Sequence, residues 1–302
     1  MGGIISHVQR FSLHDGPGVR TTVFFMNCPL RCRWCHNPET LSGRRGLTYR
    51  PDKCIHCLGC AAVCPSGALT ADGEGLLAYD PALCRFCFAC ADACPPRALT
   101  VAGQETGAEE LLRELLRDRT MYGRTGGGIT FSGGEPTMQS AFLNELLDLC
   151  AGEGIHTAVD TCGLCDGATF LALCRKARLV LFDLKHMDSA RHRELTGAPN
   201  EHILENARAL SENGVKMDIR VPVVPGCNDD EDNLDATAEF VGTLSGVERV
   251  ALLGYHKLGL SKSYGFGLRQ EDTGLESPSA ARMQALCERF QKRIPGIPVS
   301  YR

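Results

Sequence analysis

Three closely spaced cysteines, Cys28, Cys32 and Cys35, are the residues of this chain best suited to unusual chemistry. Thiolate sulfur favours iron–sulfur or zinc sites. Three thiolates can hold three irons of a [4Fe–4S] cluster and leave the fourth iron without a protein ligand, which marks a reactive centre. The alternative is a structural zinc site with His36 as the fourth ligand. We favour the cluster, because Cys35 and His36 are adjacent and would close one tetrahedron only under strain.

A second set of cysteines forms an internal repeat with a period of 30 residues. Residues 54–70 and 84–100 both contain the spacing C-x2-C-x2-C-x3-C-P. Two-cluster bacterial ferredoxins have this pattern, and in them the fourth cysteine of each run binds the other cluster. Structural zinc is the alternative, but two identical runs argue against it. We therefore predict two more [4Fe–4S] clusters, one on Cys54, Cys57, Cys60 and Cys94, the other on Cys84, Cys87, Cys90 and Cys64.

Short polar strings in the second half of the chain form a third group of candidates. Each is predicted to lie at or just after the end of a strand, where barrel-type α/β proteins collect their functional residues. We therefore expect one shared site. The alternative is that these residues have no function: the glycines form an ordinary turn, the histidine is structural, and the cysteines at 162 and 165 take no part in the site. The strings are Ser132-Gly-Gly134-Glu135-Pro136, Asp160-Thr161-Cys162-Gly163, Asp183-Leu184-Lys185, Arg220 and Tyr255-His256.

The elements that must position these residues alternate between strands and helices after residue 104, which indicates a parallel sheet built from βα units. Counting the strand at 20–27, we expect six such units, too few for a closed eight-stranded barrel. The predicted fold is therefore α/β, a partial (β/α)6 barrel. Strands are predicted at 3–10, 20–27, 128–132, 157–160, 179–183, 215–224 and 250–254, and helices at 105–119, 138–150, 166–176, 188–196, 199–213, 230–244 and 277–292.

The cysteine repeat interrupts this alternation. We predict a barrel domain made of residues 1–45 and 104–302, with a ferredoxin-like domain inserted at 46–103 after the loop of the first barrel strand. The Gly-, Arg- and Ser-rich segment 41–50 is the expected linker. Small residues and a proline around each run suit close approach of backbone N–H groups to sulfur.

Composition excludes several functional classes. The net charge of −4 leaves no basic surface for nucleic acid. No stretch approaches the roughly 18 apolar residues that a membrane span needs, and residues 1–10 lack the features of a signal peptide. Seventeen cysteines in fixed runs are typical of metal binding rather than of a secreted disulfide scaffold. We expect reduced cysteines and a cytoplasmic protein.

The first cysteines lie in a string that resembles a known family. C-x3-C-x-aromatic-C, with Trp34 as the aromatic residue, is similar to the cluster loop of the radical S-adenosylmethionine (SAM) enzymes. The strings Asp15-Gly-Pro-Gly18-Val-Arg20 and Cys35-His36-Asn37-Pro38 resemble those of the glycyl-radical enzyme activating enzymes. The resemblance implies that SAM binds the open iron and is cleaved by one electron to a 5′-deoxyadenosyl radical. The radical would take hydrogen from a backbone glycine of a partner glycyl-radical enzyme, with reduced flavodoxin or ferredoxin as electron donor.

The same resemblance implies roles for single residues. The loop of Gly134 would meet the SAM amino group, Lys185 would pair with the SAM carboxylate, and Asp15 would contact the partner. A monovalent cation near that carboxylate is implied as well. His256 would lie near the nucleoside, although Gly254 replaces the proline of the commoner Leu-Pro-Tyr-His string. The implied SAM and cation contacts are Trp34, His36, Gly134, Asp160, Thr161, Asp183, Leu184, Lys185, Arg220 and His256.

The sequence is also compatible with two other functions. The chain could be a radical SAM enzyme that acts on a small molecule, or a non-catalytic iron–sulfur protein that only carries electrons. Three cysteine ligands argue against a passive carrier, whose cluster would take four. The Asp15 string, the Tyr255-His256 string and the inserted repeat favour the activating enzyme, but they do not identify its partner.

Overall fold

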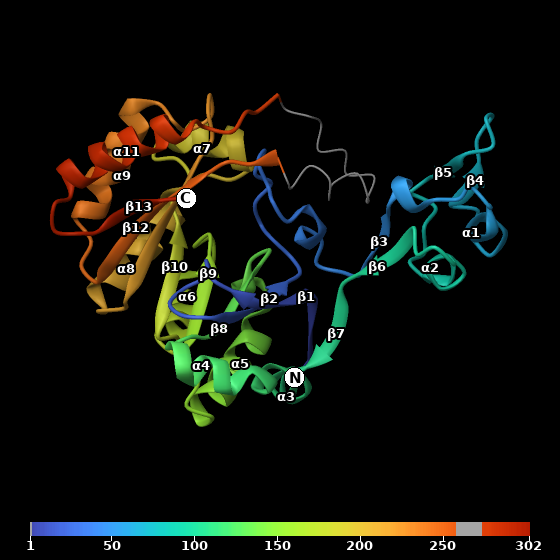
Figure 1. The fold of residues 1–302 in the computed structure, drawn as a ribbon, viewed down its shortest axis with the longest axis horizontal. Coiled ribbons are helices and arrows are strands. Elements are labelled where there is room, and N and C mark those ends of the chain that lie inside the picture. The colour runs from blue at the N-terminus through green and yellow to red at the C-terminus, as the bar shows by residue number, and fades with distance from the viewer. Residues whose placement is uncertain (1, 258–273) are drawn as a thin grey trace.

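One large sheet dominates the computed structural model, which describes residues 2–257 and 274–302 (Figure 1). Its strands follow one another in the order β13-β12-β11-β10-β9-β8-β2-β1-β7. Their bounds are β1 (Gly2–Ser12), β2 (Arg20–Phe25), β7 (Gln104–Gly107), β8 (Gly128–Gly133), β9 (Thr157–Thr161), β10 (Leu179–Asp183), β11 (Met217–Val223), β12 (Val247–Gly254) and β13 (Val299–Tyr301).

The pairing of these strands confirms the predicted fold class. Strands β2, β8, β9, β10, β11 and β12 are parallel neighbours and supply the six predicted units. Strand β13 extends the parallel part, whereas β1 pairs antiparallel with both β2 and β7. The order of the described strands is linear, so the sheet curves without closing. The result is a partial α/β barrel.

Helices cover the outer face of the curved sheet (Figure 1). The central strands are buried along nearly their whole length, as expected when helices pack against a parallel sheet. Several helices start at a polar cap: the side chains of Asp166, Asp188, Asp230 and Ser279 each accept a backbone N–H from the first turn. The helices are α3 (Ala108–Leu115), α4 (Arg119–Thr125), α5 (Ser140–Gly152), α6 (Gly167–Cys174), α7 (Ser189–Thr196), α8 (Glu201–Glu212), α9 (Glu231–Gly242) and α11 (Ala280–Arg293).

The predicted elements differ from the observed ones in three places. The helix expected at 105–119 is preceded by β7, which pairs with the start of β1, and it is split from α4 by a 3-10 turn (Leu116–Asp118). Strand β13 was not predicted. Residues 41–50, expected as a linker, include a strand (Gly46–Tyr49). Each missed strand has three or four residues and is fixed by a partner distant in sequence, which local pattern does not reveal.

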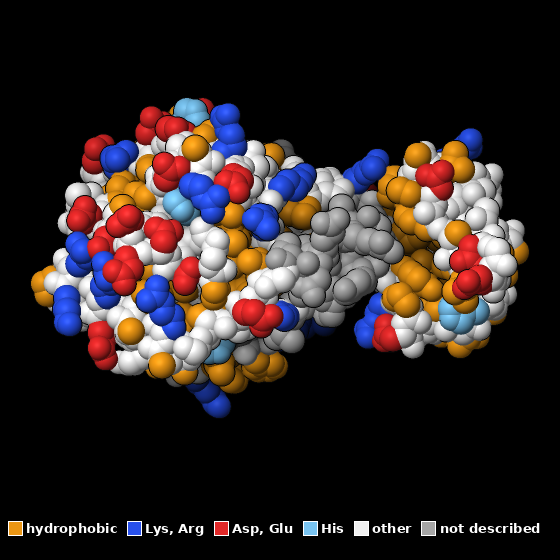
Figure 2. Space-filling view, turned by 90° about the horizontal axis from the view of Figure 1, so that it is seen from above, with side chains coloured by type: hydrophobic (Ala, Val, Ile, Leu, Met, Phe, Trp, Pro, Cys, Tyr) orange, Lys and Arg blue, Asp and Glu red, His pale blue; other side chains and the backbone are white. Residues whose placement is uncertain are grey.

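Residues 46–102 form a separate set of small elements beside the barrel (Figures 1 and 2). Strand β3 (Gly46–Tyr49) pairs with β6 (Leu99–Ala102), and β4 (Leu69–Ala71) pairs with β5 (Leu77–Tyr79). The short helices α1 (Gly59–Ala62) and α2 (Ala89–Asp92) follow the third cysteine of each run or contain it. Leu47, Leu69, Cys90 and Leu99 make a core of their own. The chain then returns to the large sheet through β7.

Candidate active site

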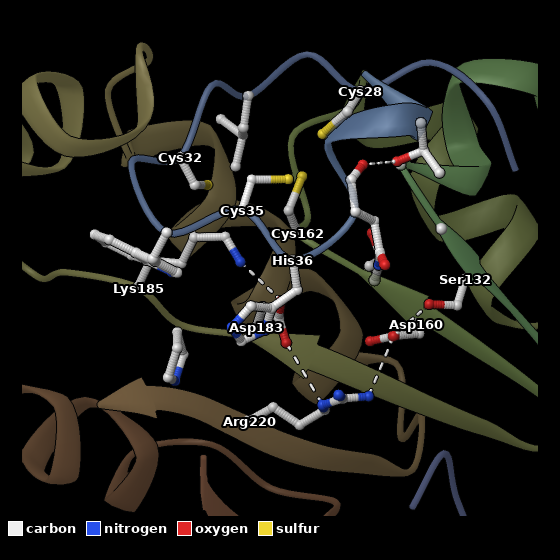
Figure 3. Close-up of a pocket in the computed structure, with 18 of the residues that line it drawn as sticks. Cys28, Cys32, Cys35, His36, Ser132, Asp160, Cys162, Asp183, Lys185 and Arg220 are labelled. Carbon is white, nitrogen blue, oxygen red and sulfur yellow. Dashed lines mark hydrogen bonds and ion pairs between the residues drawn. The ribbon is translucent and has the colours of Figure 1, made fainter. Parts of the chain in front are cut away.

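A cavity of about 190 Å³ lies at the carboxyl ends of the parallel strands (Figure 3). The cluster loop after β2 forms one side of it, and the loops after β8, β9 and β10 form the others. The structure thus brings together residues that are more than 200 positions apart in the sequence. Of the predicted site residues, those lining the cavity are Cys28, Cys32, Trp34, Cys35, His36, Gly134, Asp160, Thr161, Asp183, Lys185 and Arg220.

The loop that carries the three cysteines is held at both ends. Asn27, at a left-handed φ of 82°, turns the chain out of β2, and its N–H donates to the carbonyls of Thr40 and Ser42. Further along, the N–H groups of Arg31 and Arg33 donate to carbonyls at the end of α7. The loop is therefore fixed by backbone contacts before any cofactor binds.

The three thiols lie partly buried at one end of the cavity (Figure 3). Burial raises the pKa of Cys32 to about 12 and that of Cys35 to about 11, so each needs a metal to become a thiolate ligand. Among the described residues, no three His, Cys, Asp or Glu side chains converge on a point that would hold a single ion. Three thiols beside an open cavity fit a larger iron–sulfur group.

Cys162 is a cavity residue that the sequence interpretation missed. It follows β9, is buried and lines the cavity. Its thiol hydrogen-bonds to the Cys28 sulfur, and this bond is the main reason that the pKa of Cys28 is lowered. The available signal was its place at a strand end, in the same string as Asp160. Cys165 does not line the cavity and packs against the hydrophobic core.

The two-glycine loop after β8 is a tight backbone cradle. A Cβ on Gly134 would lie 2.4 Å from the carbonyl oxygen of Asn27, so only glycine fits there. The N–H of Gly134 already donates to Phe25 O at 2.8 Å, which leaves its carbonyl available to a ligand.

Glu135 acts as the brace that the sequence offered as an alternative. Its side chain is fully buried. One carboxylate oxygen accepts from the N–H and hydroxyl of Thr137 and from Thr161 Oγ1, and the other accepts from Cys162 N at 2.7 Å. Glu135 therefore ties the end of β8 to the end of β9.

A chain of charges crosses the floor of the cavity (Figure 3). Lys185 Nζ lies 2.7 Å from Asp183 Oδ2, and the Arg220 guanidinium lies 3.7 Å from Asp183 and 3.1 Å from Asp160. Ser132 donates to Asp160 at 2.6 Å. Burial raises the pKa of Asp160 to about 6, with Arg220 opposing this. Among the described residues, Arg220 Nε and Nη1 are buried and face these carboxylates without making a well-aligned hydrogen bond, so they can still donate to an anionic ligand.

Aromatic rings form the opposite wall. The rings of His36 and His256 stack with centroids 4.1 Å apart, and His36 also stacks on Tyr255 at 5.7 Å. Trp34 is buried against Tyr255 in a small cluster and also lines the cavity. His256 itself is exposed and reaches the cavity only through His36.

Three predicted residues make contacts within the protein itself. The Leu184 side chain packs into the core and does not line the cavity. The Thr161 hydroxyl donates to Glu135 and accepts from Gly163 N, so its hydrogen bonds are already made. Asp15 is half-buried, accepts from Thr22 at 2.8 Å and lies 4.0 Å from Arg220.

The inserted segment gathers its cysteines into two quartets around separate small cavities of about 20 Å³ each. One cavity is lined by Cys54, Cys57, Cys60 and Cys94, and the other by Cys64, Cys84, Cys87 and Cys90. The N–H groups of His56, Phe86 and Leu99 each lie 3.4 Å from a cysteine sulfur. These are the two groupings that the ferredoxin pattern predicts.

Comparison with known families agrees with this architecture. The radical SAM superfamily matches residues 81–240, a 4Fe-4S dicluster domain matches residues 47–95, and a 4Fe-4S single cluster domain matches residues 14–63. No helix in the described ranges has the length and apolar character that crossing a membrane requires.

Individual relatives are more specific. The trans-4-hydroxy-L-proline dehydratase activating enzyme of Clostridioides difficile is 38% identical over 96% of this chain and 97% of its own. The choline trimethylamine-lyase activating enzyme of Oleidesulfovibrio alaskensis is 41% identical over 86% of this chain and 85% of its own. A solved domain of pyruvate-formate lyase-activating enzyme from Bacteroides vulgatus is 34% identical, with a TM-score of 0.50, over 59% of this chain and 99% of that one. The chain belongs to the radical SAM enzymes and, among them, to the glycyl-radical enzyme activating enzymes.

Proposed function

We propose that this enzyme cleaves SAM reductively and removes a hydrogen atom from a backbone glycine of a partner glycyl-radical enzyme. A reduced cluster and bound SAM supply the 5′-deoxyadenosyl radical. The chain itself positions these groups and excludes water, which is the usual share of a protein in cofactor chemistry. The observation that carries the proposal is that the three thiols of one loop, with Cys162 beside Cys28, face a cavity that also holds charged side chains.

Each end of SAM has matching groups in the cavity. Cys28, Cys32 and Cys35 would hold the cluster. The SAM carboxylate would pair with Lys185 and with the buried guanidinium nitrogens of Arg220. Its amino group would donate to the free carbonyl of Gly134. The adenine would lie against the wall of Trp34, His36 and Tyr255, with His256 supporting that wall from behind.

The implied monovalent cation needs a rearrangement. In the structure the Arg220 guanidinium lies where a cation between Asp160 and Asp183 would lie. If Arg220 turned to the SAM carboxylate, Asp160 would lose its counter-charge and Asp183 would keep only Lys185, which lies 2.7 Å away. A monovalent cation would then replace the guanidinium, with Thr161 contributing through its carbonyl rather than through its occupied hydroxyl.

The partner glycine would approach from the side of the Asp15 loop. A second cavity of about 190 Å³ lies there, lined by Leu13, His14 and Gly16, and it shares Arg220 with the first. The loop is fixed, because Thr130 donates to the Asp15 carbonyl at 2.6 Å and the buried Arg20 donates to the Pro17 carbonyl at 3.3 Å. A rigid loop beside the reactive cavity is suited to hold an extended peptide in place.

The test compares one cysteine from each region. Anaerobic protein with its clusters rebuilt is reduced with dithionite, supplied with SAM and assayed for 5′-deoxyadenosine. We expect Cys32→Ala to give only background product. Cys57→Ala should keep most of the yield, because dithionite can reduce the barrel cluster directly. Equal yields from Cys32→Ala and the unchanged enzyme would overturn the proposal.

The glycine step has its own readout. With a glycyl-radical enzyme present, the electron paramagnetic resonance spectrum should show a glycyl radical only when SAM and the intact cysteine set are supplied. A small-molecule substrate is the alternative function, and it would give 5′-deoxyadenosine without a protein radical. The similar proteins are activating enzymes of a dehydratase and of a lyase, which favours a protein partner over a small-molecule substrate.

A further inference from the structure

The two cysteine runs of the inserted segment share one backbone but differ in their surroundings. Residues 56 and 86 have φ values of 54° and 53°, and residues 58 and 88 have values of 57° and 61°. Because the backbone is the same, differences between aligned side chains show what each run faces. The first run has Lys53, Ile55, His56 and Leu58 where the second has Leu83, Arg85, Phe86 and Phe88.

The second run is joined to the barrel. The guanidinium of Arg44 lies 4.1 Å from the ring centre of Phe86, and that of Arg45 lies 4.7 Å from Phe88. The two phenylalanine rings also meet edge to face at 6.4 Å. These arginines follow Leu41, which lines the reactive cavity. Three residues span at most about 11 Å of chain. The segment from Leu41 to Arg44 therefore connects the cavity with Phe86, the residue before Cys87.

Each run exposes its second cysteine, Cys57 or Cys87, but within the described ranges the first run has no arginine stacked on it and presents an apolar side chain there. Ile55 is 64% exposed, and His56 and Cys57 are exposed beside it. A lone apolar side chain at a surface needs no explanation by itself, but this one lies next to a thiol that lines the first quartet's cavity. An electron carrier can exchange with a cluster only where the cluster edge comes near the surface.

Two basic residues lie close in sequence to cysteines of the first quartet. Lys53 precedes Cys54, and Arg97 follows Cys94 by three residues; both are exposed. At the matching positions of the second quartet stand Leu83 and Gly67, which are uncharged. The nearby Asp52 is paired with Arg50 at 3.0 Å. The first quartet therefore combines an exposed apolar side chain with two nearby basic residues that the second quartet lacks at the matching positions, which suits an acidic partner.

We propose that electrons enter through the quartet Cys54, Cys57, Cys60 and Cys94, at a surface formed by Lys53, Ile55, His56, Cys57 and Arg97 where an acidic one-electron carrier protein docks. The carrier gives up one electron and is oxidised, and the first quartet's cluster accepts that electron. It then passes to the second quartet and on toward the barrel. No proton moves. Of these steps, only the transfer of the electron from the second quartet toward the barrel rests on the function proposed above.

The docking surface is small, as in other electron-transfer encounters. Such contacts are governed by charge at the rim, which acts on the association rate and is weakened by salt. At the second run Arg44 and Arg45 stack on the two phenylalanine rings, while Cys87 is exposed, so the experiment must compare the two runs directly.

The experiment measures cluster reduction, not catalysis. A photoreduced plant-type [2Fe–2S] ferredoxin, an acidic protein, is mixed anaerobically with the full-length enzyme carrying its clusters, and the loss of cluster absorbance is followed by stopped flow. The test variant is Lys53→Glu combined with Arg97→Glu. The control is Arg85→Glu, the same kind of charge reversal at the second run. Reduced methyl viologen, a small cation that needs no docking surface, reports whether the clusters of each variant remain reducible.

We expect the double variant to be reduced by ferredoxin at least about 10-fold more slowly at low ionic strength, and to lose most of its salt dependence. Arg85→Glu should keep the rate of the unchanged enzyme, and all three proteins should react alike with methyl viologen. An unchanged rate in the double variant, or an equal loss in Arg85→Glu, would refute the surface. Neither SAM nor a glycyl-radical enzyme is present in this experiment. Its result therefore does not depend on whether the proposed catalytic function is correct.

Discussion

The barrel cavity and the two quartets of the inserted segment present the same donor atom in different surroundings. In the barrel, the three thiols of the cluster loop and the Cys162 thiol share about 190 Å³ with charged residues such as Lys185 and Arg220. In the insertion, each set of four thiols encloses only about 20 Å³, lined mainly by apolar side chains. An incomplete ligand set with room beside it admits a substrate, whereas a complete set in a tight apolar shell admits only an electron. Ligand number and adjacent space, rather than sulfur itself, separate the two roles.

The largest effect should come from closing the space in the barrel. In Gly134→Ala the new Cβ would lie 2.4 Å from Asn27 O and 2.9 Å from Thr40 O, both backbone atoms. The loop must shift, and a displacement of about 1 Å at a reactive site costs about 100-fold in rate. We expect 5′-deoxyadenosine formation to fall by about this factor under dithionite reduction, with SAM affinity falling in a binding titration.

The insertion provides the matched control. A Cβ on Gly59 meets only Cys57 Sγ, at the ordinary distance of 3.8 Å, and the second run already has Ala89 at the same position. Gly59→Ala should therefore leave both SAM cleavage and the iron content unchanged. If Gly134→Ala cleaved SAM as fast as Gly59→Ala, the cradle would have no part in binding SAM and the contrast between the two regions would be lost.

A smaller effect is expected from Glu135→Gln. Four donors point at the Glu135 carboxylate, and an amide offers one acceptor and one donor in its place. At least one buried donor, such as Cys162 N, loses its partner, which costs about 1–3 kcal/mol. The temperature of thermal unfolding should fall by several degrees, and SAM cleavage should fall with it because Glu135 links two of the loops around the cavity.

The exposed Glu74, in the turn between β4 and β5, is the comparison for this change. Glu74→Gln removes a carboxylate from the insertion without touching a buried donor, so its unfolding curve should match that of the unchanged enzyme. A Glu135→Gln enzyme that unfolds at the same temperature as Glu74→Gln would show that the brace does not stabilise the site.

The sequence predicts much of the difference between the barrel site and the inserted quartets. Cysteine spacing is a local property, so the runs at 28–35, 54–64 and 84–94 predict clusters before any fold is known. Strands β8, β9, β10 and β11 were visible because each is a mostly buried run followed by a helix. The polar strings could be placed at strand ends for the same reason, and the cavity gathers most of them.

What the sequence did not reveal depends on distant partners. Cys162 was interpreted as a bystander because nothing local shows that its thiol meets Cys28. Arg220 was predicted to contact SAM, but its place between Asp160 and Asp183 follows from strand order alone. Strands β7 and β13 are too short to carry a pattern, and their pairing with β1 and β12 is set by the whole sheet.

The smallest effect tests the link between the two regions. In Arg44→Gln the side chain keeps much of its length but loses the cation that lies 4.1 Å above Phe86, a contact worth about 0.5–1 kcal/mol at an exposed site. The global unfolding temperature should barely move. Backbone amides around Phe86 should instead exchange with deuterium several-fold faster, because local opening becomes easier by that amount. Arg85→Gln removes a neighbouring charge that makes no such stacking contact with Phe86, so its exchange pattern should stay as it is. Equal acceleration in both variants would mean that positive charge near the second quartet, and not the stacked arginine, holds the insertion to the barrel.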